Sequence, residues 1–189
     1  MESDGILAVK AARGAIEAEV TGAVYEPELP PSFDRESGVF VTINTFPEGD
    51  LRGCIGYPDA VFPLKDALVY SAQSACHDPR FPPLSKREAS QCTVEVTILT
   101  RPEIMDKKTL PGSIVIGKHG LVIQFGRRRG VLLPQVPVEW GWDAEEFLCQ
   151  LSLKAGLPMD AWKLSDAEIY AFEGEIYHEK EPYGEIVRG

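Results

Sequence analysis

A short stretch with two glycines and a cysteine, Leu51–Gly56, constrains the fold of this chain more than any other segment. It follows a β-branched run, Val39–Ile43, across the turn-forming residues Pro47–Asp50. Two such runs separated by proline, glycine and aspartate are typical of a β-hairpin. Because strand side chains alternate between two faces, we expect Arg52 and Cys54 to share one face of the returning strand. The sequence therefore predicts a guanidinium beside a thiol.

Gly53 and Gly56 lie inside this predicted strand, where glycine leaves packing area unused. Their presence indicates that either a ligand or another chain segment approaches the backbone closely. In the alternative interpretation the glycines form only a bulge, and Cys54 is a small buried apolar side chain. Both interpretations remain open from the hexapeptide alone.

The overall composition is typical of a globular protein made of one domain or two small subdomains. The chain has 189 residues, of which 44% are hydrophobic and 25% charged, and no apolar run approaches the ~20 residues that span a bilayer. Its acidic N-terminus lacks the charged and apolar regions of a secretory signal. We therefore expect no membrane contact, a cytoplasmic location and reduced cysteines.

The four cysteines are widely spaced and form no Cys-x-x-Cys pair. A zinc site made of Cys54, Cys76, His77 and Cys92 would lack the usual chelate spacing. We predict no structural metal and no cofactor.

A formal net charge of −10 argues against bulk binding of nucleic acid, which needs a basic face. It is compatible with a local cationic pocket for a small anionic ligand, because cations recur in several motifs of the chain. In the alternative each cation is a solvated surface charge. The cations that would line the pocket are Arg52, Arg80, Lys118, His119 and Lys154.

The hydrophobic pattern predicts helices that do not alternate one to one with strands, and hairpins that join neighbouring strands. This combination indicates an α+β fold of two subdomains with mainly antiparallel sheets flanked by helices. Charged and turn residues place the seam between them near 101–112, and 179–189 is expected to be a loose tail. Helices are predicted over 4–21, 63–76 and 143–154, and strands over 92–100, 113–116, 121–125, 131–133 and 168–177.

The most concrete catalytic hypothesis uses Cys54 as a nucleophile. A thiol reacts as its thiolate, and the predicted neighbour Arg52 would lower its pKa. A proton carrier is also needed, and His119, flanked by Gly117 and Gly120, is placed for exposure better than His77 or His178.

Other polar residues in the motifs are candidates for ligand binding. Glu95 lies on the polar face of its predicted strand, either as a partner for a cation or as a solvated side chain. Asp78 and Arg80 face the same way on extended backbone and form either part of the site or a structural pair. Gln135 follows Pro134 and presents an amide to a ligand or to a strand end. The ligand-binding candidates are Gly53, Gly56, Arg80, Glu95, Lys118, Gln135 and Lys154.

Six blocks in a fixed order give this chain a resemblance to a known family. The resemblance is to the AMMECR family, named for the chromosomal region of Alport syndrome, midface hypoplasia, intellectual disability and elliptocytosis. It spans nearly the whole chain, as a stand-alone single domain, and implies the same α+β fold. The blocks are Leu51–Gly56, Asp78–Pro83, Ile116–Gly120, Leu132–Val136, Gly141–Asp143 with Glu146–Leu148, and Lys154–Pro158 with Trp162.

The family resemblance implies a pathway more than a reaction. Relatives are encoded near, or fused to, a radical S-adenosylmethionine enzyme and a dioxygenase-like protein, and this chain lacks the three-cysteine motif of the radical enzyme. Two hypotheses follow. The chain is a cysteine-using enzyme acting on a small anionic or nucleobase-bearing substrate in that pathway, or it is a non-catalytic module that binds a ligand or a partner protein there. An open pocket with a histidine or carboxylate in reach of Cys54 would favour the enzyme.

Overall fold

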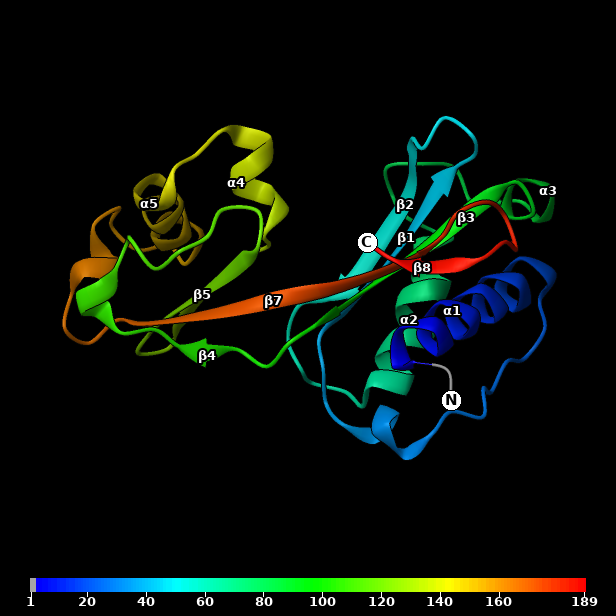
Figure 1. Ribbon diagram of the computed structural model, residues 1–189, viewed down its shortest axis with the longest axis horizontal. Coiled ribbons are helices and arrows are strands. Elements are labelled where there is room, and N and C mark those ends of the chain that lie inside the picture. The colour runs from blue at the N-terminus through cyan, green and yellow to red at the C-terminus, as the bar shows by residue number, and fades with distance from the viewer. Residues whose placement is uncertain (1–2) are drawn as a thin grey trace. The chain divides into compact units, whose positions relative to one another are not determined.

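The computed structural model describes residues 3–189 (Figure 1), so Met1 and Glu2 of the acidic N-terminus lie outside the described residues. The chain divides into two compact units. Unit 1 contains the chain up to Leu99 together with Glu175–Gly189, and unit 2 is Thr100–Gly174. Strand β7, Glu168–Glu179, contributes residues to both units.

Unit 1 begins with the long helix α1, Asp4–Thr21. Its first turn is capped by Ser3, whose side-chain oxygen accepts the N–H of Ile6 at 3.5 Å. It ends at Gly22, whose φ of 72° lies in the left-handed region that glycine tolerates. Alanines dominate the buried side of the helix, which lets α1 pack closely on its neighbours.

The sheet of unit 1 has β1, Val39–Thr45, between β2, Leu51–Tyr57, and β3, Cys92–Leu99, and both pairings are antiparallel. Helices α1 and α2, Leu64–Ala75, pack on the face that carries the buried aliphatic side chains of β1 and β3 (Figure 1). Burial of these side chains supplies the main stabilisation of the unit. Short helices η1, Pro31–Asp34, and α3, Lys86–Ala89, complete it.

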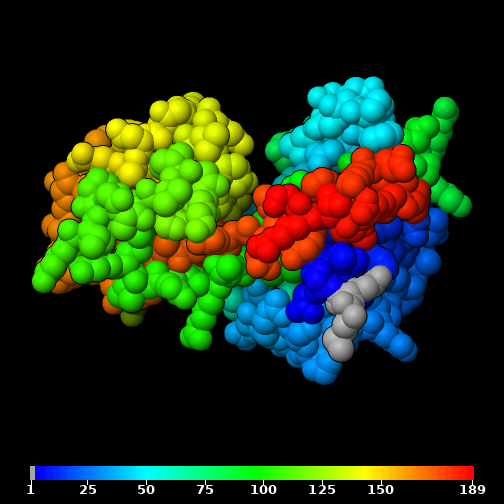
Figure 2. Space-filling view, viewed as in Figure 1, coloured from blue at the N-terminus to red at the C-terminus, as the bar shows by residue number. Residues whose placement is uncertain are grey.

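The C-terminal segment of unit 1 is ordered as a strand. Residues Ile186–Arg188 form β8, which pairs antiparallel with Tyr177–Glu179 of β7. This segment packs against α1, and Figure 2 shows the red C-terminus lying on the blue N-terminal helix. Where sequence analysis expected a loose tail from 179 onward, the structure has a hairpin.

Unit 2 has its own antiparallel sheet, in which β5, His119–Phe125, pairs with β6, Arg128–Leu132, and with β7. The short β4, Glu103–Ile104, pairs with the other edge of β7. Helix α5, Ala144–Lys154, packs on β5 and β6 through a core that includes Phe147, Leu148 and Leu151. The helical elements are η2, Lys107–Thr109, α4, Gln135–Trp140, α5, Ala144–Lys154, and η3, Ala161–Lys163.

The α+β fold with antiparallel sheets is confirmed. The strand predicted over 113–116 is wrong, because Ser113 and Ile116 lie in turns and the next strand, β5, begins at His119. The strand predicted over 131–133 begins earlier, since β6 starts at Arg128. Within residues 3–189 no helix has the length and apolar character that a membrane span requires.

Candidate functional site

A bulge in β2 separates Arg52 from Cys54. Gly53 stands opposite Ile43, and Leu51 stands opposite the next residue, Asn44. Arg52 is therefore an extra residue, and the alternation of side chains is offset there. The expectation that Arg52 and Cys54 share a face is wrong for this reason.

The Arg52 side chain is engaged by residues of the loop before α3 and of α3 itself. Its Nη2 donates to the carbonyl oxygen of Pro82 at 2.9 Å and to Glu88 Oε1 at 3.2 Å. Only 12% of the side chain is exposed. Arg52 thus ties the edge of the sheet to α3 and does not serve as the cation beside Cys54.

Cys54 is hydrogen-bonded through its N–H, its carbonyl oxygen and its sulfur. Its N–H donates to Asp78 Oδ2 at 2.9 Å, and its carbonyl accepts from Arg80 Nη2 at 3.4 Å. Its sulfur accepts from the hydroxyl of Thr42, the residue opposite on β1, at 3.2 Å. Since β2 is an edge strand, these contacts replace a neighbouring strand at this position.

Burial is the largest influence on the Cys54 thiol and raises its pKa. The hydrogen bond from Thr42 and the charge of Arg80 lower the pKa, whereas the charges of Glu95 and Asp78 raise it. The net direction is upward, which is opposite to the lowered pKa that a nucleophilic role predicts. At neutral pH the thiol keeps its proton.

Asp78 and Arg80 form the structural pair that sequence analysis held open as one alternative. Asp78 is 2% exposed, and its two oxygens accept from the N–H of Cys54 and from the backbone and guanidinium of Arg80. The hydrogen bonds from Arg80 hold the pKa of the Asp78 carboxyl well below its usual range. The carboxylate therefore stays charged and pins the proline-rich loop to β2.

Glu95 completes a row of three polar side chains across the sheet. It stands opposite Thr42, which stands opposite Cys54, so the three lie side by side on β3, β1 and β2. This row lies on the face opposite α1 and α2, because the alternate residues Val41 and Val94 face the helices. Burial raises the pKa of Glu95, and the nearby His178 lowers it less. We call these residues, Thr42, Cys54 and Glu95, the polar row.

The two glycines of β2 accommodate the protein's own atoms. A Cβ on Gly53 would lie 2.3 Å from the carbonyl oxygen of Ala75 at the end of α2. A Cβ on Gly56 would lie 2.5 Å from the ring of Phe40. Of the two interpretations, close approach by another chain segment accounts for both glycines.

The remaining candidates belong to unit 2. His119 Nδ1 accepts the N–H of Val115 at 3.2 Å, which places the proton of a neutral imidazole on Nε2. Lys118 Nζ lies 3.1 Å from Glu173 Oε1, and His119 Nε2 lies 3.8 Å from the same oxygen. Gln135 begins α4, Lys154 ends α5, and both are exposed. His119 therefore lacks a free lone pair for general-base work in its neutral form.

The cysteines are all free, with Cys76 and Cys92 buried and Cys54 and Cys149 half-buried. Among residues 3–189 no group of three or more His, Cys, Asp or Glu side chains is arranged to hold a metal ion. Thr42 is the residue of the row that sequence analysis missed. Thr42 lies within the predicted strand Val39–Ile43, and the register of the hairpin, which pairs it with Cys54, would have identified it.

The geometry defines a class of α+β protein in which a cysteine-bearing edge strand is pinned by an aspartate–arginine loop. The family model for AMMECR1 matches residues 9–177, and the chain belongs to this family.

The family relatives cover nearly the whole chain. It is 53% identical over 163 residues to a protein of Aquifex aeolicus (strain VF5), a match that covers 85% of this chain and 84% of the other. It is 52% identical over 193 residues to a protein of Methanocella arvoryzae, a match that covers 97% of this chain and 95% of the other. The crystal structure of uncharacterized protein PH0010 from Pyrococcus horikoshii is similar, with a TM-score of 0.79 and 44% identity over 98% of this chain and 96% of that one.

Proposed function

We propose that this AMMECR1-family protein is a non-catalytic binding module whose polar row recognises an uncharged polar ligand, such as an amide or the edge of a nucleobase. The observation that carries the proposal is that the cations of unit 1 near Cys54 are paired with carboxylates, whereas the polar row contains no cation. The guanidinium of Arg52 is bound to Glu88, and that of Arg80 to Asp78. The polar row, by contrast, combines a hydroxyl, a protonated thiol and a carboxyl whose pKa burial raises.

An anionic ligand fits this surface poorly. A phosphate or carboxylate would compete with Glu88 for Arg52 and with Asp78 for Arg80, and it would face the charge of Glu95 whenever that group is ionised. A neutral amide or base edge offers both donors and acceptors, which match a hydroxyl and a carboxyl without an unpaired charge. The proposal therefore favours a nucleobase-like ligand over the small anion that sequence analysis considered.

The catalytic alternative is a cysteine enzyme that acts in a pathway with a radical S-adenosylmethionine enzyme. It requires a Cys54 thiolate and a base within reach of it. The raised thiol pKa and the occupied Nδ1 of His119 both weigh against that role. A binding module in the same pathway needs neither feature.

The proposal is tested by NMR titration of the ¹⁵N-labelled full chain with acetamide, uracil and adenine, and separately with inorganic phosphate. We expect the uncharged probes to shift the amide resonances of β1, β2 and β3 around the polar row, and phosphate to leave them unchanged. Thr42→Val should weaken binding of the responding probe by about fivefold, the effect of one hydrogen bond.

Thr97→Val is the matched control, because Thr97 stands on the same face of β3, opposite Phe40 and outside the polar row. It should bind the probe as the unmodified protein does. The proposal would be overturned if phosphate alone shifted the amide resonances around the polar row. It would also be overturned if Thr42→Val and Thr97→Val lost the same affinity for the probe.

A further inference from the structure

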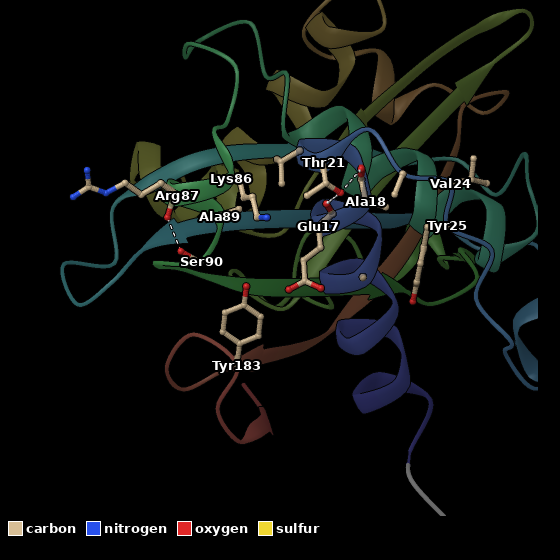
Figure 3. A pocket seen from close by; sticks show the side chains of 13 residues that line it. Glu17, Ala18, Thr21, Val24, Tyr25, Lys86, Arg87, Ala89, Ser90 and Tyr183 are labelled. Atoms are coloured by element: carbon tan, nitrogen blue, oxygen red, sulfur yellow. Dashed lines mark hydrogen bonds between the residues drawn. The ribbon is translucent and has the colours of Figure 1, made fainter.

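We propose a second ligand site in unit 1: a pocket between α1, α3 and the C-terminal loop that binds a small carboxylate with an apolar body. Its volume is about 840 Å³, within the range of small-molecule sites. Figure 3 shows the pocket over the second half of α1, flanked by Tyr25 and Tyr183. None of the three residues of the polar row lines it, so this site is independent of the function proposed above.

The walls of the pocket are apolar and aromatic. Gly14 and Ala18 leave the surface of α1 without large side chains. The Tyr25 ring packs so closely on Gly14 that a Cβ there would lie 2.5 Å from it. Val24 is 89% exposed beside them. Such a surface gains free energy when an apolar body covers it, because exposed aliphatic and aromatic atoms leave water.

Tyr183 forms the opposite wall and is held there at a conformational cost. Its φ of 61° makes it the one non-glycine residue with positive φ among residues 3–189, and such backbone persists where surrounding contacts enforce it. The guanidinium of the buried Arg13 lies 4.6 Å from the centre of its ring. Burial, and after it the neighbouring Glu17 carboxylate, raises the pKa of the Tyr183 hydroxyl. The wall is therefore preformed, which reduces the entropy that a ligand loses on binding.

A single cation is directed at this apolar surface. In Figure 3 the Lys86 side chain extends over the pocket toward Thr21, whereas Arg87 extends away from it. Lys86 and Arg87 are exposed, and neither side chain forms an ion pair within the part of the chain that the structure describes. The acid that faces the pocket, Glu17, lies at the Tyr183 end. In a chain of net charge −10, an unpaired ammonium over apolar walls selects a ligand with one negative charge and an apolar body.

Decanoate and decanol are the probes, because they share a chain length and differ in charge. We expect decanoate to shift the amide resonances of Ala18, Thr21, Tyr25 and Tyr183 in an NMR titration of the full chain, and to bind at least about threefold more tightly than decanol.

Lys86→Ala should weaken decanoate binding about threefold and leave decanol binding unchanged. Arg87→Ala is the matched control, since it removes the same charge from the same short helix, and it should have little effect. Thr21→Trp, at an exposed position, should fill the pocket and abolish binding of both probes while the melting temperature stays the same.

Equal affinities for decanoate and decanol, equal effects of the two α3 variants, or a lack of shifts at the pocket up to millimolar decanoate would each overturn the site. Because the titration follows residues outside the polar row, its failure leaves the function proposed above untouched, and the reverse also holds.

Discussion

Two glutamates of strand β7, Glu179 in unit 1 and Glu173 in unit 2, have opposite surroundings. Glu179, in unit 1, is 5% exposed and accepts hydrogen bonds from the buried Arg13 and from the N–H of Val94 at 3.0 Å. Glu173, in unit 2, has a side chain that is 44% exposed and lies 3.1 Å from Lys118. Water and salt screen the second pair but hardly reach the first. A pair of one glutamate and one cation therefore stabilises the fold in unit 1, whereas in unit 2 it lies at the surface and contributes little to stability.

The same contrast separates the candidate residues of the two units. In unit 1, Asp78 and Arg80 hold the backbone of Cys54, so most of the motif residues there serve the fold. In unit 2, Gln135 and Lys154 are exposed at helix ends. A polar residue in a motif block is therefore a guide to function only after its internal partners have been identified.

The largest effect is expected for Glu179→Ala. Removing the carboxylate leaves the buried Arg13 guanidinium and the Val94 N–H without their acceptor, so the free energy of unfolding should fall by about 4 kcal/mol. Glu173→Ala is the control on the same strand and should change it by less than about 0.5 kcal/mol. Urea denaturation followed by circular dichroism measures both. Equal losses would break the comparison between the two halves of β7.

Asp78→Ala should come next, with a loss of about 3 kcal/mol, because the Cys54 N–H loses a charged acceptor in a buried site. Arg80→Ala should cost clearly less, since 55% of the Arg80 side chain is exposed and the bond from Cys54 to Asp78 remains. Hydrogen exchange at the Cys54 amide follows the same bond directly. An Asp78→Ala protein with unchanged stability and unchanged protection at Cys54 would refute the pinning of β2.

A smaller effect is expected in the pH dependence of stability. Burial raises the pKa of Glu95 above its ordinary value of 4.5, so the folded state binds this proton more tightly than the unfolded state. Its contribution to stability is full below the unfolded pKa and is lost as the pH rises through the folded pKa. Glu95→Gln removes this titration and should gain stability relative to the unmodified protein at about pH 8 but not at about pH 4. A constant difference across that range would contradict the burial of the carboxyl.

The hairpin, the α+β class and the family were predictable from the sequence, because periodicity, turn residues and motif blocks are local signals. The bulge at Arg52 was not, because it depends on the register between Asn44 and Leu51, which side-chain alternation alone cannot give. Because of that one extra residue, the side chains of Arg52 and Cys54 do not share a face of the strand.

Long-range packing hid the other features. Glu179, at the start of the C-terminal hairpin, accepts a hydrogen bond from Arg13, which lies 166 positions away along the chain. Likewise Tyr183 lines its pocket only because the loop after β7 returns to α1. Neither contact leaves a periodic signal in the sequence.

The state of the Cys54 thiol tests the central claim most directly. In a Cys149→Ser background, where Cys76 and Cys92 are buried, the rate of alkylation by iodoacetamide against pH reports on Cys54. Burial raises the pKa of this thiol, so we expect slow alkylation at neutral pH and an inflection above that of a free cysteine. Fast alkylation with an inflection below neutrality would show a thiolate, and the protein would then have to be regarded as a cysteine enzyme.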